Sequence, residues 1–271
     1  MATTADYRIY AVRYAHRLAP ATHCFIGADP HEGPLEMDYF VWAIVGGGRT
    51  VVVDVGFEPG EGARRGRTLV RDPVDGLGAI GIDPTSVEDV IITHMHYDHA
   101  GNLQRFPNAR FHIQDTEIAY ATGRAMVHRS LRHSYSLEDV LETVRMVHRG
   151  RVVFHDGDEE ILPGLSVHHV PGHTRGLQSV RVRTGAGAVM VASDAVHFYD
   201  NLHHQRPYGT VVDIQGMMDG HRKVLSLATS IDHVVPGHDA EVMRRYPAVS
   251  PELAGVAVRL DVDPLPRSLS S

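Results

Sequence analysis

Short apolar runs rich in Val and Ile recur along the chain, and Gly, Pro or Asp bounds most of them. This pattern predicts a protein with many short β-strands. Three consecutive glycines, Gly46, Gly47 and Gly48, separate the second run from the third and predict a hairpin turn. The expected strands cover residues 8–14, 40–45, 50–55, 90–93, 110–113, 151–154, 165–170, 178–182, 188–192 and 233–235.

Helical periodicity is found in three later segments, residues 115–122, 137–148 and 213–228. Strands joined by hairpins come first along the chain, and strands interleaved with helices follow. This order favours an α/β sandwich with its sheets inside and its helices outside. No repeat or long linker divides the sequence, so we expect residues 1–271 to form a single domain.

Seven His and Asp side chains directly follow expected strands. Four of them lie within six residues of one loop, after the strand at residues 90–93, and one more follows each of three later strands. Strand ends open onto a shared cleft, so these side chains can converge there. Imidazole and carboxylate groups in this number suit two divalent metal ions. In chain order the seven residues are His94, His96, Asp98, His99, His173, Asp194 and His238.

The composition agrees with metal chemistry and excludes several other functions. Histidine, the commonest metal ligand, occurs 20 times in the 271 residues. A formal net charge of −7 excludes a global basic surface for nucleic acid. No apolar run is long enough to span a membrane, and a single cysteine, Cys24, excludes an internal disulfide. We therefore expect a cytoplasmic protein without nucleic-acid or membrane partners.

The seven side chains, together with an aspartate after the third strand, resemble the metal-binding pattern of the metallo-β-lactamase superfamily from about Asp54 to His238. The resemblance implies a four-layer αββα sandwich with a two-metal site between its sheets. It also implies that Asp194 bridges the two metals and that Asp54 orients a metal ligand. The implied ligands of the first metal are His94, His96 and His173, and those of the second are Asp98, His99 and His238.

Within the superfamily, the segments 94–102, 171–174 and 193–195 are most similar to the N-acyl homoserine lactonases. Aspartate rather than cysteine at the bridging position argues against the branch of true zinc β-lactamases. Those lactonases carry a tyrosine three residues after the bridging aspartate, and its hydroxyl assists at the substrate carbonyl. His197 occupies that position here, and Tyr199 lies two residues further on.

We therefore expect a hydrolase that opens a lactone, with N-acyl homoserine lactones and a quorum-quenching role as the leading candidates. Two metal ions, zinc before iron or manganese, would hold a hydroxide that attacks the carbonyl. Asp98 would pass a proton to the leaving group, and His197 would assist at the carbonyl oxygen. Another ester, a thioester, a cyclic amide or a phosphodiester is the alternative substrate. An iron-dependent oxidoreductase is less favoured, because the ligands of both metals are present.

Residues 114–150 are expected to form a helical insertion that caps the substrate pocket. Tyr120, Met126 and Tyr135 would supply its apolar lining, although packing of these helices on the sheet explains the same residues. Residues 29–39 form either a mobile flap or a plain loop. The expected partner is a small lactone or ester, and a homodimer is the assembly considered, although the sequence does not fix the oligomeric state.

Two clusters outside the motifs have competing interpretations. Four arginines after the third strand either hold an anionic group of the substrate or form a solvated charged face, and the charged face is favoured. Two histidines after the Asp194 loop lie either at the pocket mouth or on the surface, and the surface is favoured. These residues are Arg64, Arg65, Arg67 and Arg71, and His203 and His204.

Overall fold

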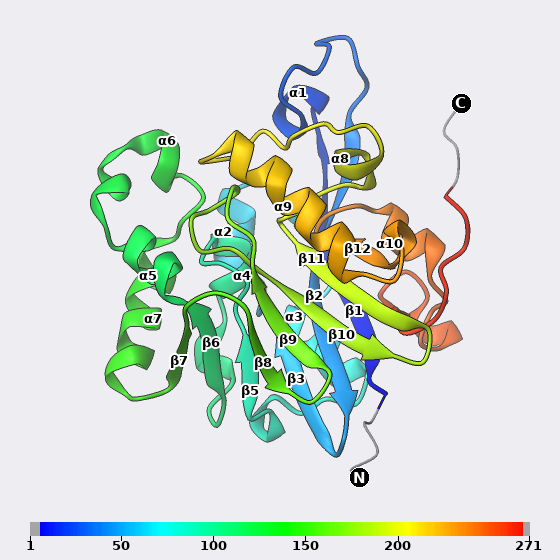
Figure 1. The fold of residues 1–271 in the computed structure, drawn as a ribbon. Helices are drawn as coiled ribbons and strands as arrows, with labels where there is room; N and C mark the ends of the chain where they lie inside the picture. Colours follow the sequence, from blue (N-terminus) through cyan, green and yellow to red (C-terminus); the bar gives the residue numbers. More distant parts are fainter. Residues whose placement is uncertain (1–5, 268–271) are drawn as a thin grey trace.

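The computed structural model describes residues 6–267 and contains two β-sheets packed face to face (Figure 1). The first sheet has the order β13 (Ala257–Arg259), β1 (Arg8–Ala19), β2 (Leu35–Gly46), β3 (Arg49–Val53), β5 (Asp89–Ile91), β6 (Arg110–Gln114) and β7 (Val152–His155), with β4 (Thr68–Leu69) beside β1. The second has the order β12 (Val234–Pro236), β11 (Gly187–Ser193), β10 (Gln178–Thr184), β9 (Leu165–His169) and β8 (Glu159–Leu162).

Strand β2 is apolar along most of its length because both of its faces are buried. Successive side chains of a strand point to opposite faces of the sheet. Phe40, Trp42 and Ile44 pack between the two sheets, against Val180 and Val191 of the second sheet among others. The intervening side chains pack in the core cluster on the outer face of the first sheet. Both faces of β2 are therefore buried, as a central strand of a four-layer structure requires.

Helices cover the two outer faces. On the first sheet, Leu77 of α3 (Pro73–Ala79) and Met146 of α7 (Leu137–His148) belong to the outer core cluster. On the second sheet, Val224 of α9 (Ile214–Leu227) packs with Met190 of β11. These layers confirm the expected αββα sandwich. The remaining α-helices are α1 (Ala21–Cys24), α2 (Pro59–Arg64), α4 (Tyr97–Ala100), α5 (Asp115–Ala121), α6 (Arg129–Arg132), α8 (Tyr199–His203) and α10 (Glu241–Arg245).

The structure corrects the expectation for residues 29–39. Their second half belongs to β2, which begins at Leu35 and pairs with β1 from Ala19 to Arg8. Only residues 29–34 fall outside a helix or strand, so the segment is neither a complete flap nor a complete loop. Two prolines, Pro30 and Pro34, obscure the start of this strand in the sequence, because proline punctuates loops.

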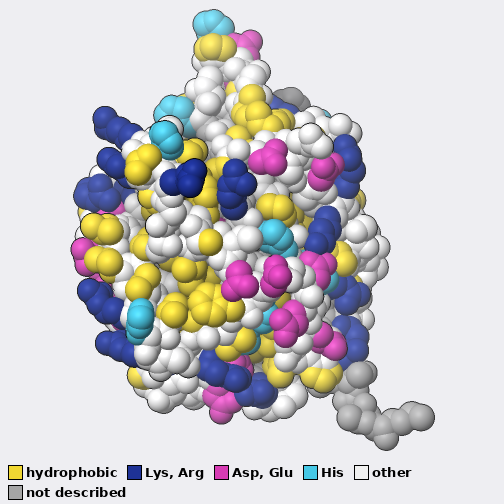
Figure 2. Space-filling model, turned by 60° about the vertical axis from the view of Figure 1, so that its left-hand side comes forward, with side chains coloured by type: hydrophobic (Ala, Val, Ile, Leu, Met, Phe, Trp, Pro, Cys, Tyr) yellow, Lys and Arg dark blue, Asp and Glu magenta, His cyan; other side chains and the backbone are white. Residues whose placement is uncertain are grey.

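Residues 114–150 connect the parallel strands β6 and β7, which require a crossover connection. Helix α7 packs on the sheet as an ordinary crossover helix. The preceding part packs instead around Met95, with Tyr120 and Tyr135 in the same buried cluster. Figure 2 turns this side forward and shows hydrophobic side chains on its surface between basic ones. None of the helices within residues 6–267 is long and apolar enough to cross a membrane.

Candidate metal centre

The structure brings all seven expected side chains together at one edge of the two sheets. The loop after β5 and the short helix α4 carry four of them, and the ends of β9, β11 and β12 carry one each. All seven are buried, with at most 7% of any residue exposed to solvent. They form two groups, and the Asp194 carboxylate contacts both of them. Ligand-type atoms of His94, His96, His173 and Asp194 lie within 4.8 Å of one another, as do those of Asp98, His99 and His238.

In the first group, three imidazole nitrogens surround one carboxylate oxygen. His96 Nδ1 lies 3.0 Å from His94 Nε2 and 2.9 Å from His173 Nε2. The Oδ2 atom of Asp194 lies 3.2 Å from His173 Nε2 and 3.7 Å from His94 Nε2. The group therefore presents three nitrogens and one oxygen to a common point, a donor set that suits a divalent cation such as zinc.

The second group faces the other oxygen of the same aspartate. Asp194 Oδ1 lies 3.1 Å from His238 Nε2 and 3.4 Å from His99 Nε2. The Asp98 carboxylate lies beside the same nitrogens, 3.8 Å from His99 Nε2 and 3.9 Å from His238 Nε2. One carboxylate thus has one oxygen in each group.

Acceptors behind the rings fix the orientation of three histidines. The Nδ1 of His99 donates to Asp54 Oδ2 at 2.7 Å, that of His173 to the Thr210 carbonyl at 2.7 Å, and that of His238 to the Asp38 carbonyl at 2.8 Å. A neutral imidazole that donates from Nδ1 has a free lone pair on Nε2. Each Nε2 therefore points into the cluster, and in the neutral ring it is the acceptor that a metal ligand needs.

Asp54 is a fully buried carboxylate behind the cluster. Its Oδ1 accepts from the Thr93 backbone N–H at 2.7 Å, and its Oδ2 accepts from the Thr93 hydroxyl at 2.8 Å as well as from His99. Burial raises the pKa of Asp54, while these donors counteract that rise. Its backbone φ of +58° is in the left-handed region, a conformation that non-glycine residues rarely adopt and that clusters at functional sites.

The charges of the cluster also fit a bound cation. Burial, together with neighbouring histidines, lowers the pKa of His94 and of His96 well below the usual value, so both rings are neutral. Burial would lower the pKa of His99 as well, but three nearby carboxylates raise it. Among residues 6–267, the buried His99 Nε2 and Asp194 Oδ1 have no hydrogen-bond partner. Buried polar atoms are rarely left unpaired, and a cation between these two atoms would satisfy both.

Comparison with known proteins agrees with this arrangement. The model of the metallo-β-lactamase superfamily matches residues 37–247. The chain belongs to this superfamily. An N-acyl homoserine lactonase of Bacillus thuringiensis is 29% identical over 133 residues, 49% of this chain and 48% of that protein. The N-acyl homoserine lactonase AttM of Azorhizobium caulinodans is 29% identical over 176 residues, 60% of this chain and 62% of that protein. The matched region thus spans between about half and three fifths of these two relatives.

Solved structures show the same superfamily fold over most of the chain. A quorum-quenching N-acyl homoserine lactone lactonase superimposes with a TM-score of 0.73 at 22% identity, covering 89% of this chain and 95% of that one. AidC, a dizinc quorum-quenching lactonase, superimposes with a TM-score of 0.68 at 15% identity, covering 88% and 89%. At these identities the likeness establishes the shared architecture.

In this member of the superfamily, Gly237 makes room for the shared aspartate. A Cβ atom at Gly237 would lie 2.9 Å from Asp194 Oδ1 and 2.7 Å from the Ser193 carbonyl carbon. These separations are too short for a side chain, so the residue before His238 has to be glycine for the strand ends to approach so closely.

We expect Gly237→Ala to displace the Asp194 carboxylate and to weaken metal binding by the second group about 10-fold or more, a loss comparable with that of a supporting contact. Metal analysis after dialysis measures the change. Gly78→Ala is the matched control, because a Cβ there meets no atom within 4 Å. An alanine variant that keeps two ions per chain with unchanged affinity would contradict this steric account.

His197 reaches the cluster, whereas Tyr199 does not. His197 Nε2 lies 3.0 Å from Asp194 Oδ2, and its ring stacks on Tyr208 with 3.3 Å between the centroids. Burial lowers the pKa of His197 to about 3, although Asp194 acts in the opposite direction, so the ring is neutral. Tyr199 is buried in the core between the sheets, under the Arg245 guanidinium. Tyr208 was not found from the sequence, because no motif marks it.

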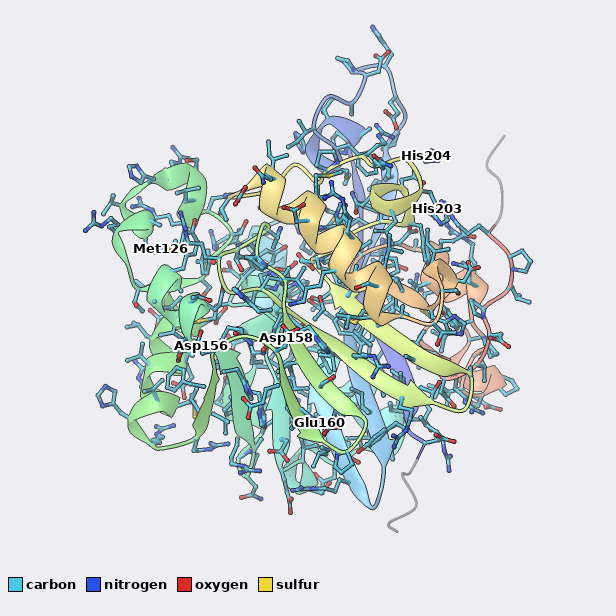
Figure 3. All side chains as sticks on the ribbon, viewed as in Figure 1. Met126, Asp156, Asp158, Glu160, His203 and His204 are labelled. Carbon is cyan, nitrogen blue, oxygen red and sulfur yellow. The ribbon has the colours of Figure 1, made fainter. Side chains whose placement is uncertain are left out.

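A cavity of about 390 Å³ opens beside the two groups. Residues from several elements line it, including Asp98, His197 and Tyr208. From the 114–150 insertion, His133 and Ser134 line it. The expected lining of Tyr120 and Met126 is wrong: Tyr120 lines a separate cavity, and Met126 packs against the cluster around Met95 (Figure 3). Tyr135 lies behind His96, with 4.7 Å between the rings.

The peripheral clusters divide between surface and cavity. His203, the last residue of α8, and His204, which follows it, are both exposed at the surface (Figure 3), as the favoured interpretation predicted. Arg64 is exposed and pairs with Glu61, and Arg71 is exposed as well. Arg65 and Arg67, by contrast, line the cavity, so the charged-face interpretation is wrong for these two.

Glu117 of α5 is a fully buried carboxylate that the sequence does not reveal. Its Oε1 accepts from the Met95 backbone N–H at 2.9 Å and from the Tyr135 hydroxyl at 3.1 Å. Its Oε2 accepts from the Thr174 hydroxyl at 2.7 Å and from the Gly176 N–H at 3.0 Å. One side chain therefore connects the loop of His94 and His96 to the loop of His173.

Proposed function

We propose that this protein is a metal-dependent hydrolase that opens a lactone ring, with an N-acyl homoserine lactone as the reference substrate. The observation that carries the proposal is the position of Asp194, whose two oxygens face two separate groups of buried ligand-type side chains. Two relatives named N-acyl homoserine lactonase, each matched over only part of its length, support the choice of a lactone.

The residues fit two divalent ions, zinc before iron or manganese. His94, His96 and His173 would hold the first, Asp98, His99 and His238 would hold the second, and Asp194 would contact both. When bound, such a pair supplies a water of lowered pKa and polarises a carbonyl oxygen. The buried cluster excludes bulk water around these groups, which strengthens electrostatic interactions within it.

The chain's own residues account for the rest of the reaction. Hydrolysis joins a water oxygen to the carbonyl carbon and breaks the bond between that carbon and the ring oxygen. The ring oxygen must then take up a proton to become an alcohol, while the carbonyl carbon becomes the carboxylate of the same hydroxy-acid product. Asp98 lines the cavity and would carry this proton. His197 and Tyr208 line the same cavity, and His197 would assist at the carbonyl oxygen.

A substrate panel tests the proposal. Metal-loaded protein is assayed against lactones, thioesters, cyclic amides and phosphodiesters, and the metal content of the same sample is measured. We expect about two ions per chain and ring opening of lactones. Activity confined to phosphodiesters, or none on lactones at full metal loading, would overturn the lactonase proposal. Oxygen consumption by an iron-loaded sample would favour an oxidoreductase instead.

We expect His197→Phe to lower kcat on a lactone by about 100-fold, within the usual range for a hydrogen-bond donor to the developing oxyanion, while the protein keeps both metals. Phenylalanine preserves the stacking on Tyr208 and removes the ring nitrogens. Tyr199→Phe is the control, because Tyr199 lies in the core. If His197→Phe loses metal in parallel with activity, His197 orients Asp194 rather than assisting at the carbonyl.

A further inference from the structure

Two arginines line the wall of the metal-side cavity from adjacent parts of the first sheet. Strands β1 and β4 are antiparallel, and His16 lies opposite Thr68. Arg17 follows His16 on β1, and Arg67 directly precedes β4, so the pairing of these strands brings the two residues to the same part of the fold. Both side chains line the cavity together with Asp98 and Asp194.

Among residues 6–267, neither guanidinium group forms an ion pair with a carboxylate within 4.0 Å, and Asp98 attracts Arg67 only from a greater distance. Among the described residues, the Arg17 guanidinium makes one hydrogen bond, from Nε to the Met37 sulfur at 3.3 Å, and sulfur is a weak acceptor. Arg67 donates from Nε to the Tyr97 hydroxyl at 2.9 Å and from Nη1 to the Arg65 carbonyl at 2.6 Å. Its Nη2 and both Nη atoms of Arg17 remain available.

Two neighbouring arginines, in contrast, have their charges compensated by an ion pair with a carboxylate. Arg64 and Arg65 both pair with Glu61, and Arg65 also donates to the His133 carbonyl at 2.7 Å. Arg65 is thus held by the protein itself. Arg17 and Arg67 differ because their contacts fix the side chains without compensating their charge.

The Tyr39 ring lies between Arg67 and the ligand-type residue His238. The Tyr39 ring lies against the His238 ring, with 4.9 Å between centroids, and the Arg67 guanidinium lies 5.8 Å from the centroid of the same Tyr39 ring. Among the described residues that line the cavity, only Asp98 and Asp194 are acidic, and both face the metal groups. The open side of the cavity is therefore positively charged.

We infer that Arg17 and Arg67 form an anion-binding subsite, and that the substrate carries a carboxylate or phosphate group besides the bond that is hydrolysed. This inference rests on the proposed lactone hydrolysis. Paired guanidinium groups match the oxygens of either anion, with hydrogen bonds strengthened by charge. The subsite selects a compact anionic lactone over one that carries only an aliphatic chain.

The test compares matched lactones that differ in one side group, a carboxylate, its neutral primary amide or a phosphate monoester. The metal-loaded wild type should favour an anionic lactone over the amide by 10-fold or more in kcat/KM, the size of one hydrogen bond to a charged group. High salt should reduce this ratio. Arg17→Gln and Arg67→Gln should each lower the ratio, and the double variant should bring it near one. Arg64→Gln is the matched control, and its ratio should equal that of the wild type. The carboxylate and phosphate arms identify the preferred anion.

Binding of the ring-opened products, followed by calorimetry, separates the two proposals. The wild type should bind the product with the carboxylate side group more tightly than its amide, and the double variant should lose this difference. Hydrolysis of lactones without an anion preference would overturn the subsite and leave the lactonase proposal intact. Preferential binding of the anionic product without hydrolysis of any lactone would support the subsite and overturn the lactonase proposal. A double variant that keeps the preference would overturn the subsite.

Discussion

Asp194→Asn is expected to abolish hydrolysis, lowering kcat/KM by at least about 1,000-fold, and to lower the metal content below two ions per chain. Residues that merely support a metal ligand contribute roughly 10- to 100-fold to affinity or activity, so a residue in contact with both groups should contribute more. The Asp194 oxygens lie between 3.0 and 3.7 Å from five imidazole nitrogens. An amide keeps the shape of the side chain and removes its negative charge.

Steady-state kinetics and elemental analysis of the same preparation measure both effects. Asp219→Asn is the matched control, because Asp219 is an exposed aspartate on α9 that pairs with Arg222. A variant at position 194 that retains two ions and the activity of the wild type would show that Asp194 does not connect the two groups.

Glu117→Ala is expected to destabilise the protein by about 3–5 kcal/mol, because each buried donor that is left without an acceptor costs about 1–3 kcal/mol. Four donors lose their acceptor at once, from Met95, Tyr135, Thr174 and Gly176. Three of these, Met95, Thr174 and Gly176, belong to the loops that carry the histidines of the first metal group. The loss should therefore reach the metal as well as the fold, and denaturant unfolding with and without metal measures both.

Glu117→Gln keeps the prediction testable if the alanine variant does not fold. Glutamine retains one acceptor oxygen and replaces the other with an N–H donor that opposes existing donors. We expect a smaller loss of stability and about 10-fold weaker metal binding. Glu138→Gln, at an exposed position of α7, is the control. Unchanged metal affinity in Glu117→Gln would limit Glu117 to a structural role.

The strand ends were visible in the sequence because each ligand-type residue directly follows a local apolar run. The helix at Leu137–His148 was likewise predicted to the residue, because its periodicity and its capping serine, Ser136, are both local. Glu117 was not visible, because its partners come from loops that approach only in the folded chain. Arg17 was missed for the same reason: its neighbour Arg67 is 50 residues away in sequence and is brought beside it by the pairing of β1 with β4.

The shortest elements were also missed, because two to four residues carry no clear period. Strands β4, β8 and β13 and the helices flanking the cluster depend on tertiary contacts for their existence. Tyr135 was expected to contribute to the apolar lining of a cap over the substrate pocket. Its hydroxyl instead donates to Glu117 behind the loop of His94 and His96.

The two sheets contribute unequal shares to the cluster: the loop of His94 through His99 leaves the first sheet, whereas His173, Asp194 and His238 leave the second. Any cation held by both shares would act as a further cross-link between two halves of the molecule that apolar packing and hydrogen bonds, such as those of Glu117, already join. Its binding energy adds to the cohesion of that interface, because a ligand that binds only the folded state stabilises it. Chelation should therefore loosen the sandwich along its midplane first, at the end where the substrate enters.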